Sequence, residues 1–373
     1  MTARGIAHYA KLPQRLFAGF IESAVRTFCP IRGVVSNQPL RPINNIPAES
    51  TVENFAVGGG EGGKYNVLIF SHGLVGGLSA YCQTCIDFIR EHRTGGNGRE
   101  NGKWIVVAVE HGDGSAIAAM VGGKKLFMKK ASDTEIKEKF GEGNGWKWRN
   151  SQVKQRGWEV EQIVNWLHDV NSGKVGMDGI GVGKGKLGER SEENGNPESD
   201  RFLKGKLNLE NGVFMAGHSF GGATSLHHGL YQEQCSGMIL MDPWLWPMGE
   251  DAMRDQFRGN NTKRILVIMN ELSGMEGSVK WIKILKGHNN EKVDLDIVTI
   301  KNANHHVQSD YAFVFGSKLT KWIGLAPDAK YEARKYNSVN NVLCSKFLDE
   351  EVWKEFKEQV ERGEVFEHDI NFH

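Results

Sequence analysis

Residues 212–225 of the chain read GVFMAGHSFGGATS. The apolar first half predicts a buried strand, and the segment after the glycines predicts a helix from about 221 to 232. Between them lies Gly217-His218-Ser219-Phe220-Gly221, a G-x-S-x-G motif. Where a strand turns directly into a helix, this motif marks a sharp turn that raises a serine above the edge of a sheet. The stretch therefore predicts an α/β fold with Ser219 at the carboxyl end of a strand.

Further apolar runs on both sides of this stretch predict more strands. They are residues 66–73, 104–111, 237–244, 264–271 and 295–306. Helical patterns separate several of them, at 79–92 and 149–171. Continuous apolar strands that alternate with helices are typical of a parallel sheet covered on both faces. We therefore expect an α/β fold with a mostly parallel central sheet and helices on both faces.

The chain is expected to form a single domain over residues 1–373 with three parts. These are an N-terminal helix and approach segment (1–60), the core (61–350) and a C-terminal tail (351–373). Residues 172–206 are rich in Gly, Lys and Glu and predict a mobile insertion, and residues 93–103 extend a second loop. The glycines at 183, 185 and 188 match a dinucleotide-binding pattern, but they follow a helix rather than a strand, so we reject that interpretation.

Composition excludes several classes of protein. Lys and Arg total 46 and Asp and Glu total 45, and this balance argues against a nucleic-acid-binding protein. The chain lacks a run of about 18 apolar residues, so no transmembrane helix is expected. Its first residues lack the apolar region of a secretory signal. The five cysteines are scattered, which favours a reducing compartment and predicts a cytoplasmic protein. Cys82 and Cys85 form a lone C-x-x-C, which we interpret as two packed thiols on a helix.

Residues 10–28 predict an amphipathic helix. Its apolar face contains Leu16, Phe17, Phe20, Ile21 and Phe28. We favour a helix that packs on the body of the protein. The alternative is a peripheral contact with membranes, in which Lys11, Arg15 and Arg26 would meet anionic head groups. The oligomeric state is left open by the sequence.

A serine hydroxyl needs a histidine base, and the histidine needs a carboxylate to orient it. Downstream of Ser219, only His305 and His306 directly follow a predicted buried strand. Two acids compete: Asp242 ends the strand after the elbow helix, and Glu271 ends the next strand. Spacing alone decides neither choice.

Acyl transfer also needs an oxyanion hole, which is a pair of backbone N–H groups that binds the developing negative charge. One donor comes from the residue after the nucleophile, Phe220, and the other from a loop after an early strand. Leu74 is the natural candidate, because it follows the first core strand in the stretch FSHGL. We expect neither a metal nor a cofactor, since no cluster of residues has metal-ligand spacing.

These residues belong to six stretches that together resemble a known family. They are FSHGL (70–74), AVEHGDGSA (108–116), RNSQVKQR (149–156), GHSFGGAT (217–224), MDPWLWPMGE (241–250) and KNANHHVQSDYAF (301–313). In this order they resemble the plasma-type and type II intracellular platelet-activating factor acetylhydrolases, which are calcium-independent group VII phospholipases A2. The resemblance covers roughly residues 60–350.

The resemblance implies an α/β-hydrolase fold and settles the open choices. It maps the acid to Asp242 and the base to His305, because Asp310-Tyr311 follows His305 at the family's spacing. The oxyanion donors map to Leu74 and Phe220. There are departures: His306 stands where the family often has Gln, and the loops at 93–103 and 172–206 are longer than expected.

The implied function is that of a serine esterase with a phospholipid substrate. It would hydrolyse the sn-2 acetyl, or a short or oxidised sn-2 acyl ester, of platelet-activating factor-like glycerophospholipids. The alternatives within catalysis are a phospholipase A1 and a general carboxylesterase or lipase. An idle α/β-hydrolase that serves as a binding module is the non-enzyme alternative, and the intact Ser219, Asp242 and His305 argue against it.

Overall fold

A computed structural model of the protein describes residues 64–93, 103–121, 124–129, 131–175, 203–232, 234–249, 263–273, 278, 280, 282, 293–310, 333–366 and 369–373. The predicted helix at 10–28 and the glycine pattern at 183–188 lie outside these residues. So does most of the two predicted insertions, 93–103 and 172–206.

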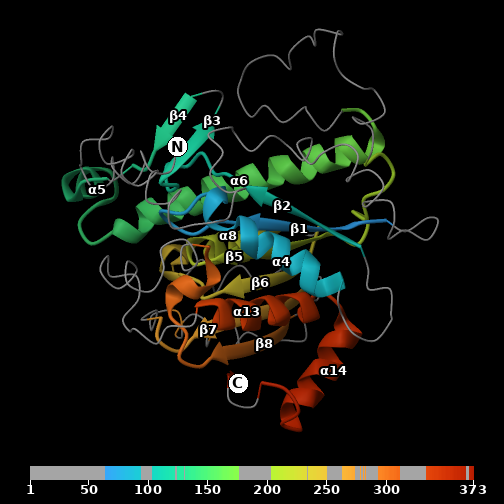
Figure 1. The fold of residues 1–373 in the computed structure, drawn as a ribbon. Helices are drawn as coiled ribbons and strands as arrows, with labels where there is room; N and C mark the ends of the chain where they lie inside the picture. Colours follow the sequence, from blue (N-terminus) through green and yellow to red (C-terminus); the bar gives the residue numbers. More distant parts are fainter. Residues whose placement is uncertain are drawn as a thin grey trace, which may run out of the picture.

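A seven-stranded sheet forms the centre of the molecule (Figure 1). In spatial order its strands are β2 (Trp104–Val109), β1 (Asn66–Ser71), β5 (Val213–His218), β6 (Cys235–Met241), β7 (Lys263–Asn270), β8 (Val293–Ile300) and β9 (Ile370–Phe372). All neighbours are parallel except β9, which runs antiparallel to β8. All six strands predicted from the apolar runs are confirmed, and so is the mostly parallel architecture.

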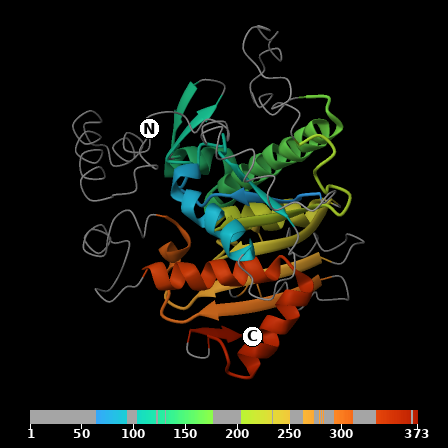
Figure 2. The same ribbon diagram turned by 45° about the vertical axis from the view of Figure 1, so that its right-hand side comes forward.

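Helices cover both faces of this sheet (Figures 1 and 2). One face carries α6 (Gly145–Ser172) and α8 (Phe220–Tyr231). The other carries α4 (Cys82–Arg93), α13 (Ala333–Phe347) and α14 (Glu350–Glu361). The smaller elements are the turns η1 (Leu78–Ala80), η2 (Trp246–Met248) and η4 (His305–Gln308), the helix α5 (Asp133–Phe140), and a hairpin of β3 (Ala118–Val121) and β4 (Lys124–Phe127).

The central strands are apolar along their whole length because they feed two hydrophobic cores. In β1, Val67 and Ile69 face the core under α6 and α8, whereas Leu68 and Phe70 face the core under α4 and α13. None of the four side chains is more than 1% exposed. Successive side chains of a strand point to opposite faces, so a strand with helices on both sides must be apolar at every position.

The segment expected to be a C-terminal tail, residues 351–373, contributes regular structure. Most of α14 lies in it, with Trp353 and Phe356 buried against α13, and β9 adds an edge strand to the sheet. The indole N–H of Trp353 donates to Asp296 Oδ2 at 2.6 Å. The helix has a local signal, since Asp349 caps it by accepting from Val352 N at 3.1 Å. The pairing of β9 with β8 has no such local signal in the sequence.

Cys82 and Cys85 lie one turn apart on α4 as free thiols, as the sequence predicts. Burial raises the pKa of Cys82 to about 11, so this thiol stays protonated and unreactive near neutral pH. In the parts of the chain that the structure describes, no helix is long and apolar enough to cross a membrane.

Strained backbone is concentrated at the carboxyl edge of the sheet. Four non-glycine residues with positive φ follow four different strands there: Val75 (64°), Ser219 (58°), Asp242 (40°) and Asn302 (56°). Each such residue costs about 1–3 kcal/mol and persists only where the surrounding structure holds it in place. Residues of this kind cluster at functional sites, and two of these four are predicted catalytic residues.

Candidate active site

Ser219 occupies the tight turn between β5 and α8. Its amide donates to Met241 O at 2.9 Å, and its carbonyl accepts from Trp244 N at 2.9 Å. The flanking glycines are required by space. A Cβ on Gly217 would lie 2.3 Å from the backbone of Gly221, and a Cβ on Gly221 would lie 2.0 Å from the carbonyl oxygen of Ser71. The turn is therefore held by its backbone and by close approach to β1, as the sequence motif predicts.

Asp242 and His305 are in direct contact, although 63 residues separate them in the chain. Asp242 Oδ2 lies 2.6 Å from His305 Nδ1, and the carboxylate is fully buried. A carboxylate can only accept, so Nδ1 carries the proton and Nε2 is left free to act as a base. Asp242 Oδ1 also accepts from Asn270 N at 3.3 Å, which fixes the orientation of the carboxylate from β7.

In the part of the chain that the structure describes, the hydroxyl of Ser219 and the ring of His305 are not hydrogen-bonded to each other. The two segments nevertheless lie side by side, because the ring of His218 contacts the ring of His305 with 4.5 Å between their centroids. Catalytic hydrogen bonds are often long without substrate and tighten when it binds. The geometry brings Asp242 and His305 together, and the complete triad with Ser219 stays a prediction.

The two rejected alternatives have other contacts. Glu271 is exposed, and its Oε2 accepts from the backbone N–H of Asn302 at 2.7 Å, so it supports the turn that follows β8. His306 donates its backbone N–H to Asn304 Oδ1 at 2.9 Å. Burial, together with the nearby His305, lowers the pKa of the His306 side chain to about 4.

Leu74 lies in a loop in which the amides on either side of it are already used. Gly73 N donates to the hydroxyl of Tyr81 at 3.1 Å, and Val75 N donates to Ser115 O at 2.9 Å. The amide of Leu74 between them has no hydrogen-bond partner among the residues that the structure places. It is therefore available to a ligand, which an oxyanion donor must be.

The peptide that carries this amide is held from its other end. Gly73 O accepts from His72 Nδ1 at 2.8 Å, and the N–H of a trans peptide points away from its carbonyl. The loop also lies against the elbow, since a Cβ on Gly73 would lie 3.3 Å from Ser219 Cβ. Phe220 is the first residue of α8, and amides of a first helical turn have no intrahelical partner. Both predicted donors thus flank Ser219, and their role stays a prediction.

A relay through Tyr81 and His218 ties three site loops together, and the sequence analysis assigned no role to either residue. His218 Nε2 lies 2.8 Å from His305 O, so it must donate. Burial lowers the pKa of His218 well below its usual value, so Nδ1 is unprotonated and accepts from the Tyr81 hydroxyl at 2.8 Å. The same hydroxyl accepts from Gly73 N. One feature of the sequence could have indicated this relay: His218 is a histidine at the variable position of the motif, in a strand that is otherwise apolar.

Replacing Tyr81 with Phe should lower kcat/KM on a water-soluble ester by about tenfold. The change leaves Gly73 N and His218 Nδ1 buried without a partner, at about 1–3 kcal/mol for each group. Both the activity and the melting temperature should fall. Tyr65→Phe is the matched control, because Tyr65 lies beside the amino end of β1, at the opposite edge of the sheet. Equal kcat/KM for Tyr81→Phe and wild type would contradict the relay.

The protein should lose stability as the pH falls from about 7 to about 5. Burial lowers the pKa of a set of histidines: His72, His111, His218, His227, His228 and His306. For the last three the value is about 4. The unfolded chain takes up protons below about pH 6.5 while these folded imidazoles stay neutral, so acid favours unfolding. The measurement is the free energy of unfolding across this range.

A buried acid opposes this trend and provides a check on its sign. Burial raises the pKa of Glu110 to about 7, so the folded state binds a proton that the unfolded carboxylate releases above about pH 4.5. Glu110→Gln should therefore make the loss of stability in acid steeper. Glu138→Gln, on the exposed helix α5, should leave it unchanged. A wild-type stability that rises toward pH 5 would contradict the assignment.

A parallel sheet covered on both faces, a serine at the turn after β5, and an Asp–His pair after β6 and β8 define an α/β-hydrolase. No group of His, Cys, Asp or Glu among the described residues could hold a metal ion. Residues 46–368 match the family model of platelet-activating factor acetylhydrolase, isoform II, and the chain belongs to this family.

Curated relatives carry the same name. The chain is 25% identical over 333 residues to platelet-activating factor acetylhydrolase of Gallus gallus. The matched region covers 85% of this chain and 64% of that protein. It is 27% identical over 298 residues to the Cavia porcellus protein, with 77% and 58% covered. The match thus spans about three fifths of each relative.

Solved structures similar to the chain include esterases. A ferulic acid esterase from Streptomyces cinnamoneus is 14% identical with a TM-score of 0.46, over 77% of this chain and 67% of that one. An esterase from Pyrobaculum calidifontis is 12% identical with a TM-score of 0.39, over 78% of each chain.

Proposed function

We propose that the protein is a serine esterase that hydrolyses the sn-2 acetyl, or a short or oxidised sn-2 acyl ester, of platelet-activating factor-like glycerophospholipids. The hydrogen bond of 2.6 Å between Asp242 and His305, beside a serine on a tight turn, carries this proposal. It supplies an oriented base at the place where a nucleophile is raised above the sheet. The substrate class follows the name of the family to which the chain belongs.

In the proposed acylation step, Ser219 Oγ attacks the ester carbonyl while His305 Nε2 takes its proton. Asp242 stabilises the imidazolium that forms. The amides of Leu74 and Phe220 donate to the oxyanion. The bond to the leaving alcohol then breaks, and His305 returns the proton to the lysophospholipid oxygen as it leaves. The acyl group remains on Ser219.

In the proposed deacylation step, His305 removes a proton from water, which attacks the acyl-enzyme. The bond to Ser219 Oγ breaks, and the proton passes from His305 to that oxygen. The free acid is released and the enzyme returns to its starting state. We propose that both steps are independent of calcium, so that turnover persists in excess chelator.

The test is a hydrolysis screen of phospholipids with separate labels on the sn-1 and sn-2 chains. The sn-2 chain is varied from acetyl through short and oxidised acyl groups to long acyl groups. Release of acetyl or short sn-2 groups with little release of long ones supports the proposal. Release of the sn-1 chain indicates a phospholipase A1, and equal activity on simple esters without a head group indicates a general carboxylesterase. Either result contradicts the proposed specificity.

A further inference from the structure

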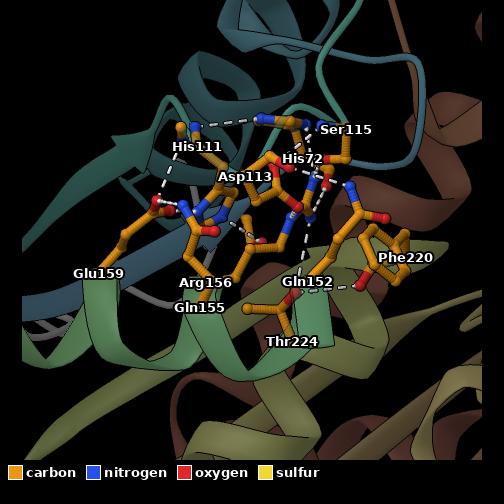
Figure 3. A network of polar contacts seen from close by, with 12 residues as sticks. His72, His111, Asp113, Ser115, Gln152, Gln155, Arg156, Glu159, Phe220 and Thr224 are labelled. Carbon is orange, nitrogen blue, oxygen red and sulfur yellow. Dashed lines mark hydrogen bonds and ion pairs between the residues drawn. The ribbon is translucent and has the colours of Figure 1, made fainter. Parts of the chain in front are cut away.

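Arg156 of α6 is a fully buried cation that lies among His72, Asp113 and Ser115 (Figure 3). Its Nε donates to Asp113 Oδ2 at 2.9 Å, and both side chains are completely buried. Burial raises the pKa of Asp113, but the guanidinium of Arg156, the nearby His111 and hydrogen bonds from Ser115 lower it to about 2. The two groups are therefore an ion pair inside the protein. A buried ion pair contributes little net stability, because the cost of desolvating the two charges can exceed their attraction.

The same guanidinium holds the loop on both sides of Leu74. One terminal nitrogen, Nη1, donates to the carbonyl of His72 at 2.7 Å. The other, Nη2, donates to the hydroxyl of Ser115, whose own carbonyl accepts from Val75 N at 2.9 Å. His72, two residues before Leu74, is thus bound by the guanidinium directly, and Val75, the residue after Leu74, is linked to it through Ser115. The Leu74 amide therefore lies between two points of the loop that one guanidinium holds, alongside the hydrogen bond from His72 Nδ1 to Gly73 O.

Arg156 also contacts the residue of the second predicted donor. Its guanidinium carbon lies 4.5 Å from the centre of the Phe220 ring, within the range of a cation–π interaction. Phe220 is the first residue of α8, and its side chain is fully buried against the guanidinium (Figure 3). One cation is therefore in contact with both segments that carry the predicted oxyanion donors.

We propose that Arg156 is a positioning residue that sets the separation and direction of the Leu74 and Phe220 amides around the oxyanion. The inference rests on the proposed esterase mechanism and goes beyond it, because Arg156 takes part in neither of the two proposed chemical steps. A planar guanidinium is needed for this role, since three donors must leave one group in fixed directions. Lysine carries the charge, but its single ammonium cannot make all the contacts together.

The test measures kcat on p-nitrophenyl butyrate for each active site, counted by complete reaction with a fluorophosphonate. Loss of an oxyanion donor lowers kcat by about 10²–10³-fold, so Arg156→Met should lower kcat for each site by about 100-fold. KM should change little, because the oxyanion is absent from the bound ester and forms only as the tetrahedral intermediate is approached. Counting sites removes misfolded protein from the comparison. A fall in kcat for each site of less than about tenfold would overturn the inference.

Arg264 offers a matched control, because it makes the same kinds of contact away from the site. Its guanidinium lies 4.6 Å from the centre of the Phe347 ring and donates to Phe347 O at 2.9 Å. Arg264→Met should lower the melting temperature and leave kcat for each site unchanged. If Arg156→Met does not fold, Arg156→Lys is compared with Arg264→Lys in its place. It keeps a charge beside Asp113, and kcat for each site equal to that of Arg264→Lys overturns the inference.

Two further measurements separate this role from others. The acid limb of the pH profile of kcat should be unchanged in the Arg156 variants, because His305 keeps its partner Asp242. A shifted limb would mean that Arg156 acts through the base, and it would overturn the inference. Guanidinium ion at low concentration should raise kcat of Arg156→Ala, whereas the same concentration of sodium chloride should not. Failure of the wild type to be labelled at Ser219 would instead contradict the proposed function itself.

Discussion

Ser219→Ala should lower esterase turnover by about 10⁶-fold, the cost of removing the serine of a comparable triad. Without the hydroxyl no acyl-enzyme can form, and the remaining amides and histidine cannot supply a nucleophile. The fold should be unaffected, because the turn is held by the Ser219 backbone and by the space around Gly217 and Gly221. The measurements are the rate of hydrolysis of the best phospholipid substrate and the melting temperature.

Ser225→Ala is the matched control for this variant. Ser225 lies on the same helix, α8, and is fully buried, and its hydroxyl has no hydrogen-bond partner in the described part of the chain. Its loss should leave turnover unchanged. Turnover of Ser219→Ala within about tenfold of wild type would contradict the nucleophile assignment.

Asp242→Asn should lower kcat by about 10⁴-fold while the protein stays folded. An asparagine can present its N–H₂ group to His305 Nδ1, and this favours the tautomer whose Nε2 carries a proton and cannot accept one from Ser219. The replacement has nearly the same shape, and its amide oxygen can still accept from Asn270 N. The measurement is kcat on a water-soluble ester together with the melting temperature.

Glu271→Gln tests the competing acid. The amide oxygen of glutamine can still accept from Asn302 N, so the turn after β8 is preserved and kcat should fall by less than about tenfold. If Glu271→Gln proved the more damaging change and Asp242→Asn were nearly silent, the orienting acid would be Glu271 and the prediction for Asp242 would be wrong.

Local patterns were sufficient for the parts of the fold that depend on local physics. The six parallel strands were predictable because a strand buried on both faces must be apolar at every position. The turn at Ser219 was predictable because a Cβ at Gly217 or Gly221 would lie only 2.0–2.3 Å from neighbouring backbone atoms, so that only glycine fits there, and such positions can be recognised in a motif. The helix α14 had a legible cap and an apolar stripe, but β9 pairs with β8 across the fold and has no local signature.

The acid and the base of the site were predictable from local patterns only in part. Strand ends placed Asp242 and Glu271, and His305 and His306, at the same edge of the sheet, but spacing could not choose between them. Resemblance to a family made the choice. The structure shows the physical difference: Asp242 is buried and meets His305, whereas Glu271 is exposed and binds a backbone amide.

The sequence by itself determined the class of fold, the position of the serine and the small set of residues able to assist it. These follow from hydrophobic periodicity and from the steric needs of a tight turn, which act over a few residues. Only the tertiary structure decided which of those residues touch, and it alone revealed Tyr81, His218 and Arg156 as contacts of the site loops. Hydrogen bonds between side chains and distant backbone groups depend on how strands and helices are brought together. They therefore cannot be predicted from the hydrophobic periodicity of the sequence.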